Sequence, residues 1–181
     1  MGAIDYIKHY TYDDYKLWKG EWELFEGHPV SMSPAPMINH QAIATKFIAQ
    51  LDHKLDNCDR CLVLGEEDYK LSDDTVLRPD VVLICDEPNE VYITKAPEII
   101  IEIISKSTAR NDEQYKFLKY EEEKVKYYII VYPDDLIAKV YKLVNAKYDK
   151  QGDFSKEIYN FEDTLCKVSI DFDKIFQRFR K

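Results

Sequence analysis

The first part of the chain alternates between short polar and apolar segments, which predicts a short helix followed by a β-hairpin. Thr11, with acidic residues close behind it, is typical of the cap of a helix of about two turns that ends at Gly20. Apolar residues on both sides of Gly27 predict a hairpin over residues 22–32. The segment Ser33-Pro34-Ala35-Pro36 is expected to end this hairpin.

The middle of the chain predicts a long helix and then three strands. Between Ile43 and Leu55 the apolar residues recur at steps of four, one, three and four, which places them on one face of a helix with Asn39 as its expected N-cap. Three apolar segments follow, and each is typical of a strand: 62–64, 81–84 and 99–104. The last is apolar except for Glu102, so we expect it to be buried on both faces.

The second half of the chain predicts another helix and a series of strands. Asn111 and Gln114 resemble a capping box, and the helix that they begin should run to about Lys124. The predicted strands of this part are 127–132, 137–143, 158–161 and 168–172. A turn is expected at 151–153, and a last helix carries Ile175, Phe176 and Phe179.

These elements define an α/β fold. Their order predicts a central mixed β-sheet flanked by helices, with an N-terminal β-hairpin and a C-terminal β-meander. A chain of 181 residues that is 45% hydrophobic can bury a core of its own, so we expect one domain over residues 1–181. No segment approaches the roughly 18 uncharged apolar residues of a membrane span, and the N-terminal segment lacks a signal-peptide core. We therefore expect a cytoplasmic protein without membrane contact.

Four cysteines are present, at positions 58, 61, 85 and 166, and we expect reduced thiols, because nothing in the sequence indicates export. Cys58 and Cys61 form a C-x-x-C motif, which is half of a zinc site. Neither a second such motif nor an H-x-x-x-H pair completes four ligands. The sequence therefore favours two ordinary loop cysteines over a zinc site.

The formal net charge of −9 argues against an extended nucleic-acid surface, because affinity for nucleic acid comes mainly from Lys and Arg. Any such contact must be local. The candidate basic patch consists of Lys106, Arg110, Lys116, Lys119, Lys124 and Lys126. Acidic residues alternate with these basic residues along the chain, so the charged pattern is equally typical of a solvated helix face.

Two carboxylates carry the candidate chemistry. Asp80 precedes the predicted strand 81–84, and Glu102 lies within the next strand, so both can reach one point if these strands are neighbours. An ionised carboxylate among isoleucines costs several kcal/mol unless a cation or hydrogen bonds compensate it. A divalent metal is one solution, and an ion pair of Glu102 with Arg78 or Lys116 is the structural alternative.

Several motifs together resemble the Uma-type family of predicted restriction endonucleases. The matching segments are Trp22 to Gly27, Met32 to Pro36 with His40, Arg78 to Val82, Pro97 to Ser105, Ser107-Thr108, Asp112 with Lys116 and Tyr120, and Tyr128 to Pro133. The resemblance covers roughly residues 15–145 in order, and the set is more specific than any single motif.

The resemblance implies a restriction-endonuclease-like PD-(D/E)XK core that binds Mg²⁺, with Mn²⁺ as a substitute. Its metal ligands would be Asp80, Glu102 and the backbone carbonyl of Ile103. The lysine of the superfamily motif would stand two residues after the glutamate, where this chain has Ile104. Lys116 on the next helix is the expected replacement, since a lysine there can reach the same water.

Three further residues are weighed as auxiliary. Glu23 matches the hairpin glutamate of the family and would complete the metal site, although an isolated strand glutamate is more often solvated. His40 would contact phosphate or water, although a histidine near a helix start is as often a surface or capping residue. Asp112 is expected to support its helix and to pair with Lys116.

The expected function is metal-dependent hydrolysis of nucleic-acid phosphodiester bonds by a putative endonuclease, with DNA as the expected partner. A homodimer is also expected, because two active sites are the simplest way to cut a duplex. A catalytically inactive nuclease fold that binds DNA or protein is the alternative. A metal-dependent hydrolase with another substrate is the third hypothesis, since the sequence lacks a strong basic stripe.

Overall fold

The computed structural model describes residues 8–32, 37–105 and 108–180. Its elements, in chain order, are α1 (Tyr12–Tyr15), β1 (Trp22–Phe25), β2 (His28–Ser31), α2 (Ile38–Lys54), β3 (Cys61–Gly65), β4 (Tyr69–Ser72), β5 (Thr75–Leu77), β6 (Val81–Cys85), β7 (Ile99–Ile103), η1 (Asn111–Lys116), α3 (Phe117–Glu122), β8 (Tyr127–Tyr132), β9 (Ile137–Val144), β10 (Lys147–Phe154), β11 (Ile158–Phe161), β12 (Val168–Asp171), α4 (Phe172–Phe176) and η2 (Gln177–Phe179).

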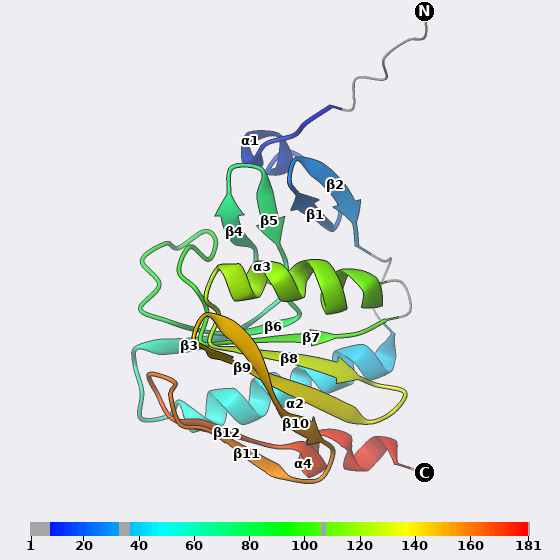
Figure 1. Cartoon of the computed structure of the whole chain (residues 1–181), viewed down its shortest axis with the longest axis vertical. Helices are drawn as coiled ribbons and strands as arrows, with labels where there is room; N and C mark the ends of the chain where they lie inside the picture. Colours follow the sequence, from blue (N-terminus) through cyan, green and yellow to red (C-terminus); the bar gives the residue numbers. More distant parts are fainter. Residues whose placement is uncertain (1–7, 33–36, 106–107, 181) are drawn as a thin grey trace, which may run out of the picture.

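A six-stranded mixed sheet forms the centre of the molecule, in the order β10-β9-β8-β7-β6-β3. Strands β7 and β8 are parallel, and the other neighbouring pairs are antiparallel. Figure 1 shows α3 on one face of this sheet and α2 on the other. The predicted α/β fold, with a central mixed sheet flanked by helices, is confirmed.

Strand β7 shows why the centre of the sheet is so apolar. Ile99, Ile101 and Ile103 pack into the core on the side of α2, whereas Ile100 packs on the side of α3. Side chains alternate between the two faces of a strand, so Glu102 shares the face of Ile100 and points toward α3. The strand geometry therefore buries a carboxylate directly beneath that helix.

A second, four-stranded sheet has the order β2-β1-β5-β4 and lies beyond α3 in Figure 1. The N-terminal hairpin β1–β2 is confirmed, with its turn at Glu26 and Gly27, both at positive φ. The hairpin β4–β5 was not predicted, although its alternation around the acidic pair Asp73-Asp74 is a recognisable turn signal. The expected end of the first hairpin at 33–36 lies outside the described residues.

Two predicted helix caps are wrong. Helix α2 has Met37 as its N-cap, so Asn39 lies inside the first turn. The second helical region begins before Asn111, because Ser105 and Thr108 exchange hydrogen bonds between their side chains and backbone amides at 3.1 and 3.3 Å. This reciprocal cap lies upstream of the expected one and starts the helix earlier.

Within the described ranges, no helix has both the length and the apolar character of a membrane span.

The C-terminal part continues the sheet and then folds beneath it. The meander β8-β9-β10 is confirmed. The turn predicted at 151–153 is wrong: these residues lie within β10, where the register shifts between Lys150 and Gly152 because the glycine accompanies a β-bulge. The turn occurs instead at Asn145 and Ala146, which both have positive φ. Beyond it, β11 and β12 form a hairpin, and Phe172 of α4 packs in the core with α2.

The cysteines are not the ordinary loop residues that the sequence favoured. Two disulfides join Cys58 to Cys166 and Cys61 to Cys85, so the expected reduced thiols are contradicted by this structure. The strand register explains half of this arrangement, because Cys61 of β3 lies directly opposite Cys85 of β6. Sequence spacing could not reveal it, since the partners are 24 and 108 residues apart.

Candidate active site

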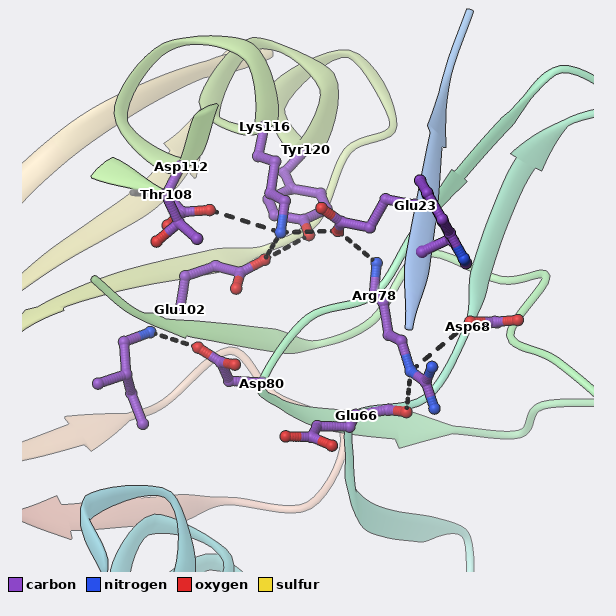
Figure 2. Close-up of polar contacts among 12 residues, drawn as sticks. Glu23, Glu66, Asp68, Arg78, Asp80, Glu102, Thr108, Asp112, Lys116 and Tyr120 are labelled. Carbon is purple, nitrogen blue, oxygen red and sulfur yellow. Dashed lines mark hydrogen bonds and ion pairs between the residues drawn. The ribbon is translucent and has the colours of Figure 1, made fainter. Parts of the chain in front are cut away.

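The register of β6 and β7 brings the two predicted carboxylates to one place. Val81 lies opposite Ile101, and Val82 lies opposite Ile100. Continuing this antiparallel register by one residue sets Asp80 beside Glu102 on the face of α3. Figure 2 shows both carboxylate groups at this edge of the sheet.

Asp80 is held by a backbone amide and a histidine. Its Oδ2 accepts a hydrogen bond of 2.6 Å from the amide of Ile103 and lies 3.3 Å from Nε2 of His40. The side chains of Asp80 and His40 are only 12% and 14% exposed, so the alternative of His40 as a solvated surface residue does not hold. Burial alone would lower the pKa of His40, but the hydrogen bond and charge of Asp80 outweigh it and raise that pKa.

Glu102 is buried and receives two hydrogen bonds. Its Oε1 accepts from Nζ of Lys116 at 3.0 Å and from the hydroxyl of Tyr120 at 2.8 Å. Burial raises the pKa of Glu102, while the charge of Lys116 opposes this increase. The negative charges of Asp112 and Asp80 raise this pKa further.

Lys116 is the centre of a buried charge cluster, drawn in Figure 2. Its Nζ lies 2.8 Å from Oε1 of Glu23, 3.0 Å from Oε1 of Glu102 and 3.4 Å from Oδ1 of Asp112. The lysine side chain is 4% exposed, so a solvated surface pair with Asp112 is excluded. Burial would lower the pKa of Lys116, but the three carboxylates raise it, led by Glu102.

Glu23 reaches this cluster from the small sheet. The solvated position expected for it as an isolated residue is wrong, because its side chain is only 6% exposed. Its Oε1 also accepts a hydrogen bond of 2.8 Å from the backbone amide of Arg78. Arg78 in turn donates to the carbonyl of Glu66 and pairs with Glu21, which fixes the segment before Asp80. The ion pair of Glu102 considered at the sequence level is therefore made with Lys116.

The helical segment over β7 supplies three of the cluster residues. Asp112 and Lys116 lie in η1, a π-helix, and Tyr120 follows in α3. The carbonyl of Asp112 accepts a hydrogen bond of 2.9 Å from the hydroxyl of Tyr128, which ties the π-helix to the sheet. Such π-helical turns occur frequently at functional sites. The contact of Tyr120 with Glu102 was not predicted, although the spacing of four from Lys116 was a usable signal.

The cluster carries more negative than positive charge. Glu23, Glu102 and Asp112 supply three carboxylates against the single ammonium of Lys116, a formal sum of −2 when all are ionised. Burial raises the pKa of each of the three carboxylates. Among the described side chains, Oδ1 of Asp112 is also buried without a hydrogen-bond partner. Such a site favours an additional cation or additional protons.

The candidate basic patch does not form a free cationic surface. Lys116 is buried, Lys119 pairs with Glu26 and Glu122, and Lys126 pairs with Glu98. Lys106, the other lysine near the end of β7, lies outside the described residues. Three of the five described members are thus paired, whereas Arg110 and Lys124 are exposed and have no ion pair among the described residues.

The chain is thus an α/β protein with a mixed sheet between helices and with two carboxylates at the ends of its central strands. The chain belongs to the Uma2 family, described as "Putative restriction endonuclease", whose match spans residues 12–169. This match confirms the resemblance to the Uma-type family that the sequence motifs indicated.

A solved structure shares this fold. It is the crystal structure from Anabaena variabilis described as "a putative nuclease belonging to DUF820", with a TM-score of 0.72 and 16% sequence identity. The similarity covers 92% of this chain and 97% of that chain. A comparison with curated proteins finds no match.

Proposed function

We propose that the protein hydrolyses phosphodiester bonds of nucleic acid with the help of a divalent metal ion. The observation that carries the proposal is the meeting of Asp80 and Glu102 beside a buried cluster that has excess negative charge. Membership in the family described as "Putative restriction endonuclease", and a fold shared with the protein described as "a putative nuclease", support the reaction class.

The donor set fits Mg²⁺, with Mn²⁺ as a substitute. Asp80, Glu102 and the backbone carbonyl of Ile103 offer hard oxygen ligands, which Mg²⁺ prefers. The charge repulsion between Asp80 and Glu102 and the net charge of the cluster both favour a bound cation. When bound, the ion would neutralise phosphate charge and activate the attacking water.

Lys116 acts as a fixed cation in this proposal. Its pKa is raised, so it stays protonated at neutral pH and cannot serve as a general base. An ammonium next to Glu102 can instead orient the attacking water or stabilise negative charge in the transition state. Glu23 and Asp112 hold the ammonium in place.

Two hydrogen bonds position the carboxylates. The amide of Ile103 fixes Asp80, and the hydroxyl of Tyr120 fixes Glu102. His40, whose pKa is raised by Asp80, can hold a proton near neutral pH and donate to a phosphate oxygen. Glu23 is assigned a positioning role, because its Oε1 already accepts from Lys116 and Arg78.

We further propose DNA as the substrate and a homodimer as the form that cuts a duplex. Two copies would place one site on each strand. Because three of the five described basic residues of the candidate patch are paired with carboxylates, substrate binding should depend on few phosphate contacts, and so only weakly on salt.

Metal dependence is the direct test of this function. Cleavage of plasmid and linear DNA by the purified protein should require Mg²⁺ or Mn²⁺, and Ca²⁺ should bind without supporting turnover. The measurement is product formation with each ion and in excess chelator. Equal cleavage in chelator would contradict the metal role.

The pH dependence of stability gives a second prediction. The folded pKa values of Glu23, Glu102 and Asp112 are raised above 4.5, 4.5 and 3.8, so above those values the folded chain binds more protons than the unfolded chain. The free energy of unfolding of the metal-free protein should therefore fall as the pH rises from about 4 through the raised values. Bound Mg²⁺ should offset this loss, with a larger effect at about pH 8 than at about pH 5.

Thermal unfolding with and without MgCl₂ at the two pH values measures this effect. The substitution Glu102→Gln removes one titrating carboxylate. It should reduce both the pH dependence of the free energy of unfolding and the stabilisation by Mg²⁺. Stabilisation by Mg²⁺ that is the same at both pH values would argue against ion binding at these carboxylates.

The inactive-module alternative rests on a specific observation: Lys116 already supplies one buried cation to Glu102. If this ammonium is the sole counterion, Mg²⁺ should neither bind nor stabilise the protein. Calorimetric titration with Mg²⁺ and Ca²⁺ therefore separates the two functions.

A further inference from the structure

Four cysteines from three separate segments meet at the end of the sheet opposite the candidate active site. Cys58 lies in the turn after α2, and Cys61 begins β3. Cys85 ends β6, and Cys166 lies in the loop between β11 and β12. Asp80 precedes β6 and Cys85 ends it, so the two sites occupy opposite ends of one strand.

The two disulfides lie side by side, so that the four sulfur atoms form one cluster. Cys58 pairs with Cys166, and Cys61 pairs with Cys85. Across these pairs, Sγ of Cys61 lies 3.3 Å from Sγ of Cys166. The Sγ atoms of Cys58, Cys61 and Cys166 all lie within 4.8 Å of one another.

We propose that, in the reduced protein, these four cysteines bind one structural Zn²⁺ as a tetrathiolate site. Zinc binds thiolates at about 2.3 Å in a tetrahedron, which sets its sulfur ligands about 3.8 Å apart. The C-x-x-C motif supplies two ligands from a tight turn, as in many structural zinc sites. The second half, absent from the sequence as a motif, comes from Cys85 and Cys166.

The surroundings of the cluster suit a closed metal site. Cys61 is 3% exposed, and Cys58, Cys85 and Cys166 are partly buried hydrophobic contacts of the same core. This apolar shell limits access of water, which favours a structural over a catalytic site. Nζ of Lys95 donates to the carbonyls of Cys85 and Asp86 at 3.4 and 3.1 Å, which holds the end of β6 in place beside the cluster.

The loop that carries Cys166 is anchored independently of its sulfur. The amide of Leu165 donates to Oε2 of Glu98 at 3.0 Å, and Nζ of Lys126 donates to the carbonyl of Asp163 at 3.0 Å. The hydroxyl of Thr164 donates to the carbonyls of Phe161 and Cys166 at 2.7 and 2.9 Å. These bonds fix the fourth ligand beside β3 and β6. A metal there would join the C-terminal hairpin to the edge of the main sheet.

The proposal is tested by metal content and thiol state of the full chain. Protein produced in zinc-supplemented medium and purified with reductant and without chelator should carry one zinc per chain by mass spectrometry of the metals. Replacement by Co²⁺ should give the intense visible absorption and the sulfur-to-cobalt charge-transfer bands of tetrahedral thiolate coordination. Denaturation with chelator should release four reactive thiols.

Matched variants separate this site from the carboxylates. Cys85→Ser and Cys166→Ser should each lower zinc content at least tenfold, whereas Asp80→Asn and Glu102→Gln should keep one zinc per chain. If a serine variant fails to fold, cobalt titration of the reduced wild-type chain gives the same answer. The proposal is overturned if the reduced chain binds neither zinc nor cobalt through sulfur, or if it keeps two disulfides under reductant.

Discussion

Asp80→Asn should lower the rate of Mg²⁺-dependent DNA cleavage by at least about a thousandfold, because it removes a charged ligand from the proposed metal site. The fold should survive this change. Oδ2 of Asp80 accepts from the amide of Ile103, and the asparagine carbonyl can accept the same hydrogen bond. Single-turnover cleavage, beside chemical denaturation of the same sample, measures both effects.

Glu98→Gln is the matched control for this experiment. Glu98 directly precedes β7, far along the strand from Glu102, and its carboxylate pairs with Lys126. The control should cleave at the wild-type rate. Wild-type cleavage by Asp80→Asn, in a preparation free of contaminating nuclease, would remove Asp80 from the site.

Lys116→Ala should affect both stability and turnover. Removing the ammonium leaves Glu23, Glu102 and Asp112 buried without their shared cation, which should lower the free energy of unfolding by about 3 to 5 kcal/mol. Loss of a transition-state contact should also lower single-turnover cleavage by roughly two to three orders of magnitude, with little change in substrate binding. The rate must be measured where circular dichroism shows the variant to be folded.

Two further lysines test the assignment. Lys119→Ala removes a partly exposed lysine one turn away, which pairs with Glu26 and Glu122, and should leave both quantities nearly unchanged. Lys106→Ala tests the other lysine near the end of β7. Wild-type turnover for Lys116→Ala, together with a collapse for either neighbour, would show that the catalytic lysine had been assigned wrongly. If Lys116→Ala does not fold, adding Glu23→Gln removes one uncompensated charge and restores a measurable protein.

Much of the fold could be predicted because its strands are marked by apolar runs. The limits of β8 and β11 agree with the predicted ranges, and β7 differs by one residue. Helix starts were harder to predict, because Asn39 and Asn111 have the right side chains for caps but lie within helical backbone. For the helix expected to begin at Asn111, Ser105 and Thr108 form the cap instead. Local residue preferences do not decide which of several possible capping residues begins a helix.

The carboxylates of the site could be predicted, but their electrostatic partners could not. A glutamate within a strand of isoleucines is recognisable from the sequence as a candidate site residue, because burial of its charge is costly. The burial of Lys116 and Glu23 depends on how the small sheet packs on α3, which no spacing within either element encodes. The same holds for Cys85 and Cys166, whose positions follow from strand register and loop anchoring.

Lys116 also joins the two sheets. Glu23 belongs to the small sheet and Glu102 to the large one, and both accept from this one ammonium. Because both carboxylates share this one ammonium, a change that moves the lysine acts on the small sheet and the large sheet together. The position of the N-terminal hairpin and the charge balance at Glu102 are therefore linked.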